Sequence, residues 1–99
     1  MSKREQYIDK MTVKLKEWDK EIEKLEQKAV NAQDNMKHKY NEQVSELRER
    51  MSNTRKKLDD ISSAGSDSFK VLKKGFEASF KILRDSIKKA AKNFKKGIS

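Results

Sequence analysis

The sequence contains no cysteine and no proline, and only three of its 99 residues are glycine. Without cysteine there can be no disulfide, thiolate nucleophile or cysteine-based zinc site. Without proline and with so little glycine, tight turns are hard to build, so β-rich folds are disfavoured. No apolar run approaches the roughly 20 residues of a membrane-spanning helix, and the first residues lack the apolar core of a signal peptide. These absences favour a helical, cytoplasmic protein, with a peripheral position on a membrane surface as the alternative.

Charge dominates what the chain does contain. Charged residues make up 41% of the sequence and apolar residues only 33%. This balance excludes a thick globular core, but it can support a narrow apolar seam between solvated faces. A chain of this length is expected to form one domain, over residues 1–99.

A seam of this kind runs through residues 8–61, where apolar and small residues recur at steps of three and four. Its members are Ile8, Met11, Leu15, Trp18, Ile22, Leu25, Ala29, Ala32, Met36, Tyr40, Val44, Leu47, Met51, Thr54, Leu58 and Ile61. Between Met36 and Val44 two successive steps of four shift the register, which changes supercoiling without ending a helix. We therefore predict one helix over about 3–61, roughly 85–90 Å long. A bend near residues 31–35 that splits it in two is the alternative.

The serine-rich segment around Gly65 is the predicted turn, at about 62–67, with Gly65 in a C′ position after the first helix. A second helix is predicted over about 68–96. Its seam consists of Phe69, Leu72, Phe76, Phe80, Leu83, Ile87, Ala90 and Phe94. The predicted fold is all-α: a long helix and a shorter antiparallel helix that form a coiled-coil helical hairpin.

The unequal lengths of the two predicted helices imply self-association. The second helix can cover only the later half of the first, which leaves an N-terminal apolar stripe without a partner in the chain. An exposed stripe of this length usually signals association. We expect a homodimer or larger homo-oligomer, most simply an antiparallel dimer of hairpins that forms a helical bundle. The predicted interface is Ile8, Met11, Leu15, Trp18, Ile22 and Leu25.

The second predicted helix is strongly basic. Residues 1–65 carry a net charge of +2, whereas residues 66–99 hold 10 basic and 3 acidic side chains, a net of +7. Its cations are Lys81, Arg84, Lys88, Lys89, Lys92, Lys95 and Lys96. They lie opposite an apolar face made of Phe69, Phe76, Phe80, Leu83, Ile87 and Phe94. This is a basic amphipathic helix.

Three interpretations of this helix stay open. The phenylalanines can pack inside the bundle while the lysines keep the particle soluble. Alternatively, the phenylalanines enter a membrane surface while the lysines meet anionic lipid. In the third interpretation the lysines bind nucleic-acid phosphates without reading sequence. There is no arginine cluster suited to base edges and no known DNA-binding motif, so sequence-specific binding is not expected.

No pattern in the sequence suggests an enzyme. His38, the single histidine, lies at helical spacing from Asp34 and Glu42, but a solvated histidine explains this arrangement better than a metal site. There is no glycine-rich phosphate loop, and the carboxylate pair Asp59–Asp60 lies near a helix end without a pocket. We predict no catalytic residues, no metal and no cofactor.

Several segments resemble a family of small bacterial coiled-coil proteins, which are described as stress-responsive after a cyanobacterial member. The resemblance is carried by residues 2–8, 15–18, 21–26 and 40–48 and by the glycine-marked break before the second helix. The Lys-Glu-Trp element that ends at Trp18 is its most distinctive part. The resemblance implies a stress-associated structural role and supplies no catalytic residues.

Together these observations predict a non-enzymatic, self-associating coiled-coil structural or interaction protein whose basic helix faces an acidic protein. The alternative is peripheral binding to an anionic membrane surface through the basic amphipathic helix. Non-specific nucleic-acid binding is the third hypothesis.

Overall fold

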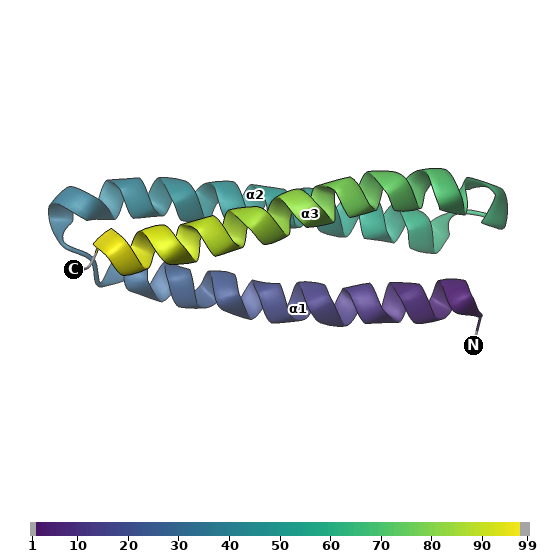
Figure 1. The fold of residues 1–99 in the computed structure, drawn as a ribbon, viewed down its shortest axis with the longest axis horizontal. Coiled ribbons are helices and arrows are strands. Elements are labelled where there is room, and N and C mark those ends of the chain that lie inside the picture. The colour runs from purple at the N-terminus through teal and green to yellow at the C-terminus, as the bar shows by residue number, and fades with distance from the viewer. Residues whose placement is uncertain (1, 98–99) are drawn as a thin grey trace.

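The computed structural model describes residues 2–97, without the side chains of Ser66 and Lys96. Three helices account for nearly all of this range: α1 (Lys3–Val30), α2 (Asp34–Ser63) and α3 (Ser66–Gly97) (Figure 1). The described residues contain no strand, so the predicted all-α class is confirmed.

The helices form an elongated bundle that measures 50 × 20 × 17 Å. α2 runs antiparallel to α1, and α3 runs antiparallel to α2, so α1 and α3 are parallel and the chain ends lie at opposite ends of the bundle (Figure 1). Two short loops make the connections, as is usual between antiparallel neighbours. α3 packs mainly on α2, but it also lies against α1.

The prediction of a continuous helix over 3–61 is wrong, and the alternative of a bend near residues 31–35 is confirmed. α1 ends at Val30, and the backbone N–H of Asn31 donates to the carbonyls of Gln27 and Ala29. Gln33 is extended, with φ −64° and ψ 150°, and α2 begins at the next residue. The physical reason is burial, because a straight rod would leave the apolar side chains of α1 in water.

The second turn is shorter than the predicted 62–67, since only Ala64 and Gly65 lie between α2 and α3. No described residue has a positive φ, so Gly65 does not end α2 in the left-handed C′ conformation that the sequence predicted. Arg4 caps this end of α2 instead. Its guanidinium donates to the carbonyls of Ile61, Ser62 and Ala64. This places a cation at the negative end of the α2 dipole and ties the start of α1 to the second turn.

One continuous core runs the length of the bundle. Its buried apolar side chains are Leu15, Ile22, Leu25 and Ala29 from α1; Tyr40, Val44, Leu47, Met51, Leu58 and Ile61 from α2; and Phe76, Leu83, Ile87, Ala90 and Phe94 from α3. Every one of them belongs to a seam identified from the sequence. Thr54, the polar seam member, is 1% exposed, and its hydroxyl donates to the Arg50 carbonyl at 2.7 Å. That bond satisfies the buried hydroxyl.

Candidate functional site

The six residues of the predicted self-association interface lie inside the bundle. Leu15, Ile22 and Leu25 are at most 4% exposed. The other three, Ile8, Met11 and Trp18, are partly buried and pack against the core. The bend after Val30 folds α1 onto its own chain, so α2 and α3 cover the stripe. The uncovered stripe was the premise of the predicted oligomer, and this premise does not hold.

The apolar face of α3 is covered as well. Phe76, Leu83 and Phe94 are 0% exposed and Ile87 is 7% exposed, while Phe69 and Phe80 are partly buried. In the closed bundle this face packs against protein, as in the first interpretation of the basic helix.

Aromatic contacts hold that face against both other helices. The Trp18 and Phe80 ring centroids lie 4.2 Å apart, and this pair joins α1 to α3. Tyr40 stacks on Phe94 at 4.1 Å, which joins α2 to the far end of α3. Aromatic pairs of this kind contribute roughly 0.5–1.5 kcal/mol beyond the area that they bury. They fix α3 along most of its length.

The cations predicted to meet an anion lie on the outside. All of them with described side chains are exposed: Lys81, Arg84, Lys88, Lys89, Lys92 and Lys95. The side chain of Lys96 lies outside the described residues. Exposed Lys70 and Lys74 extend the same helical stripe toward the start of α3, although the sequence analysis did not single them out.

We call one stripe of these side chains the basic face. It comprises Lys70, Lys74, Lys81, Arg84, Lys88, Lys92 and Lys95. The stripe extends over about 38 Å of helix at 1.5 Å per residue. Two acidic side chains lie at this stripe: Asp85 is 3.3 Å from Arg84, and exposed Glu77 lies at helical spacing between Lys74 and Lys81. The basic face therefore presents a row of cations to solvent.

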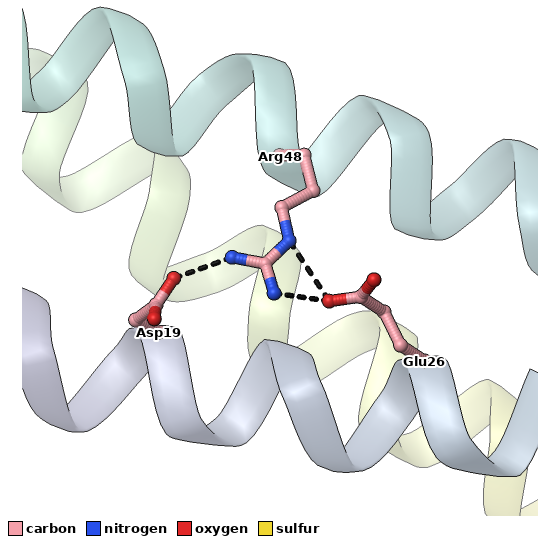
Figure 2. A network of polar contacts seen from close by, with 3 residues as sticks. All are labelled: Asp19, Glu26 and Arg48. Carbon is pink, nitrogen blue, oxygen red and sulfur yellow. Dashed lines mark hydrogen bonds and ion pairs between the residues drawn. The ribbon is translucent and has the colours of Figure 1, made fainter.

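A polar cluster between α1 and α2 has a structural role. Arg48 of α2 reaches across to Asp19 and Glu26, which lie two turns apart on α1 (Figure 2). Its Nε donates to Glu26 Oε1 at 2.9 Å. Burial lowers the pKa of Arg48, but the hydrogen bonds that its guanidinium donates to Glu26 and Asp19 outweigh burial and leave that pKa raised. The guanidinium stays charged and braces the two helices. The sequence shows two carboxylates seven residues apart on α1, but this spacing does not identify Arg48 as their partner.

A second polar contact joins α1 to α3. The Tyr7 hydroxyl donates to Glu77 Oε1 at 3.1 Å, and Lys73 Nζ lies 4.7 Å from the Tyr7 ring centroid. Burial, followed by the nearby Glu77 carboxylate, raises the pKa of Tyr7 far above its ordinary value of 10.0. A phenol with so high a pKa stays protonated near neutral pH and is a poor general base.

The remaining candidates for chemistry are exposed or isolated. His38 Nε2 lies 3.0 Å from Glu42 Oε1, and the histidine side chain is 86% exposed. Within residues 2–97 no group of three or more His, Cys, Asp or Glu side chains is placed to hold a metal ion. None of the described helices is both long and apolar enough to span a membrane.

Comparison with known proteins identifies no relative. No family model matches the chain, and no curated protein or solved structure matches it. The functional argument therefore depends on the surface of this chain.

Proposed function

We propose that this protein is a non-enzymatic interaction protein that binds an anionic membrane surface electrostatically, through the basic face of α3, while the bundle stays closed. One observation carries the proposal: the cations of the basic face are exposed, while the phenylalanines of α3 are buried or partly buried against the bundle. Because the cations lie along one side of a straight helix, several of them can contact a flat membrane surface while α3 stays packed in the bundle. Each lysine or arginine near an anionic leaflet contributes about 1 kcal/mol, so several together support salt-sensitive binding.

The aromatic residues favour lipid over unpaired nucleic acid. Proteins that bind single strands stack bases on aromatic side chains. All seven Phe, Trp and Tyr residues of this chain are buried or partly buried in the bundle, so they form no stacking surface. Duplex DNA keeps its bases stacked, and lysines can bind its phosphate backbone without an aromatic surface, so it is tested directly as a competing ligand.

Vesicle co-sedimentation tests the proposal. The protein should sediment with vesicles that contain phosphatidylserine, remain in solution with neutral phosphatidylcholine vesicles, and dissociate as salt rises. The triple variant Lys81→Glu, Lys88→Glu and Lys92→Glu should lose binding.

A matched control separates the basic face from net charge. Lys10→Glu, Lys14→Glu and Lys20→Glu change the charge by the same amount on exposed positions of α1. This control should retain most of the binding. Equal losses in both variants would show that the face has no special role. If the protein binds duplex DNA but does not bind anionic vesicles, the membrane proposal is overturned.

A second candidate is that α3 opens from the bundle and inserts its apolar face into the membrane. It is favoured by the incomplete burial of Phe69, Leu72 and Phe80 in the first half of α3. Trp18, the single tryptophan, reports on opening because it lies on Phe80. Insertion should shift Trp18 emission when anionic vesicles are added. Unchanged emission with the protein bound would exclude this candidate and leave adsorption of the closed bundle.

Self-association and a stress-associated role were predicted from the sequence and are untested. The first has lost the uncovered stripe that suggested it, and the second follows only from the resemblance to stress-responsive coiled-coil proteins. A measurement of solution mass, described below, addresses the first.

A further inference from the structure

The three grooves between the helices are closed to different degrees. Between α1 and α2, Arg48 contacts Asp19 and Glu26. Between α1 and α3, Tyr7 bonds to Glu77. Between α2 and α3 the described side chains make one polar contact, from Lys57 Nζ to Ser79 Oγ at 2.7 Å. Because α3 packs mainly on α2, the scarcity of polar contacts leaves no gap between these helices, and what it leaves uncovered is the outer surface of the α2–α3 pair.

Arg50 lines two neighbouring depressions on the outer side of the α2–α3 pair. One depression extends from Arg50 toward Lys89 and Asn93. The other extends from Arg50 toward Ser79 and Ile82. The two depressions share Arg50. Lys89 lines the first, and Lys57 bonds to Ser79, which lines the second.

Two exposed apolar side chains lie on this side of α3. Ile82 lines the second depression, and Val71 lies eleven residues before it, outside both depressions. Val71 is 73% exposed and Ile82 is 50% exposed, which makes them two of the most exposed large apolar side chains described. Gly75 and Ala78 lie between them, so the four positions are spaced four, three and four residues apart. That spacing is the seam of a helix that packs on another helix. A Cβ placed on Gly75 would meet nothing within 4 Å, so a neighbouring backbone has room to approach.

The charges around the groove select the kind of partner. Lys57 and Lys89 are exposed, while Arg50 is held by Glu46 at 2.6 Å. Glu46 lines the depression on the Lys89 side, and the described lining of the other depression contains no acidic side chain. Arg50 Nε and Gln43 Oε1 are buried without a hydrogen-bond partner. A second copy of the chain is a poor occupant, because it would bring a net charge of +9 against another +9.

We propose that the α2–α3 groove is the docking site for an acidic amphipathic helix of another protein, which completes a four-helix bundle. The apolar stripe of that helix covers Val71 and Ile82, and glutamates or aspartates on its flanks face Lys57 and Lys89. This is helix-in-groove recognition with complementary charge. The inference is independent of membrane binding, since the groove and the basic face are separate stripes of α3.

The probe for this site is a synthetic helical peptide of about four heptads, long enough to match α3. It carries an aliphatic stripe flanked by glutamates, and its matched control has lysines in place of the glutamates. Titrating the acidic peptide into ¹⁵N-labelled protein should perturb amides around Val71–Ile82 of α3 and Arg50–Lys57 of α2. The lysine peptide should leave the spectrum unchanged.

A pair of variants fixes the location. Val71→Ser with Ile82→Ser should weaken peptide binding about tenfold or more, since the apolar stripe of the peptide would lose the two side chains that it covers. Both positions are exposed, so the fold should persist, and the helical circular dichroism of the variant checks this. The control Lys81→Gln with Lys88→Gln keeps the groove and should bind within about threefold of the native protein.

Three results would overturn the proposal. They are absence of peptide binding at millimolar concentration, perturbed amides confined to the basic face, and equal affinity of the Val71/Ile82 variant and the native protein. A concentration-dependent dimer that the Val71/Ile82 variant abolishes would show that a second copy occupies the groove instead.

Discussion

The indole ring of Trp18 lies 4.2 Å from the ring of Phe80, centroid to centroid, and the two planes are inclined by 30°. This contact joins the first helix to the third across 62 positions of the sequence. It shows why the N-terminal stripe has no need of a second molecule: the phenylalanine face of α3 covers it together with α2. Phe80 also lies 5.5 Å from Phe76, so the contact continues into the core.

The phenylalanine face should dominate stability. Phe76 is 0% exposed, and Phe76→Ala should lower the free energy of unfolding by about 3–5 kcal/mol, because it removes buried ring area and leaves a cavity. Val71→Ala on the same helix, at a side chain 73% exposed, is the control and should change stability by less than about 0.5 kcal/mol. Urea unfolding followed by circular dichroism measures both. Equal effects would mean that α3 does not pack as described.

The Arg48 brace should show energetic coupling to α1. The guanidinium side chain is 36% exposed, so solvent screens the contact and the coupling between Arg48→Gln and Glu26→Gln should be modest, about 0.5–1 kcal/mol. It should decrease as salt is added. A double-mutant cycle in urea measures it, and Arg84→Gln, at an exposed position of α3, serves as the unbraced control. Additive effects at low salt would contradict the brace.

Tyr7 should make the bundle sensitive to alkali. Its pKa is raised in the folded state by burial and by Glu77, so folding disfavours loss of the phenolic proton. The contribution of Tyr7 is therefore fully present below the unfolded-state value near pH 10 and is lost as pH rises above it. Between pH 9 and 11 the native protein should lose stability more steeply than Tyr7→Phe. Parallel curves for the two proteins would show that Tyr7 titrates as it does in the unfolded chain.

The solution mass should be that of a monomer. Light scattering should give one chain, and small-angle scattering should give a radius of gyration close to the 15.7 Å of the Cα atoms. Trp18→Lys should reduce stability without changing the mass of the folded fraction, because the ring packs within the chain. A native dimer that Trp18→Lys converts to monomer would restore the stripe of α1 as an interface between molecules.

The seams could be predicted from the sequence because the buried side of a helix recurs every three to four residues, and apolar residues occupy those positions. Residues as far apart as Leu15 and Phe94 were assigned to apolar seams, and both are core residues. The basic stripe was readable for the same reason: Lys81 and Lys88 lie two turns apart on one helix, and both are exposed.

The bend at residues 31–33 was harder to place, because the seam continues through Ala29 and Ala32 without a break. The local signals were two asparagines and an aspartate within Asn31–Asn35, which compete with the helix by bonding to nearby backbone. Such residues permit a turn but do not require one. What required it was the apolar area of α1, which a straight helix could not have buried within one chain.

The sequence by itself determined that the chain is helical, which side chains form the apolar seams, and that α3 carries a row of cations. These properties depend on residues that are close together in the chain. Only the tertiary structure decided that α1 folds back, that Arg48 contacts Asp19 and Glu26, and that Val71 and Ile82 of α3 stay exposed. These depend on which faces meet in space. A periodic pattern shows that a face must be covered, but it does not specify what covers it.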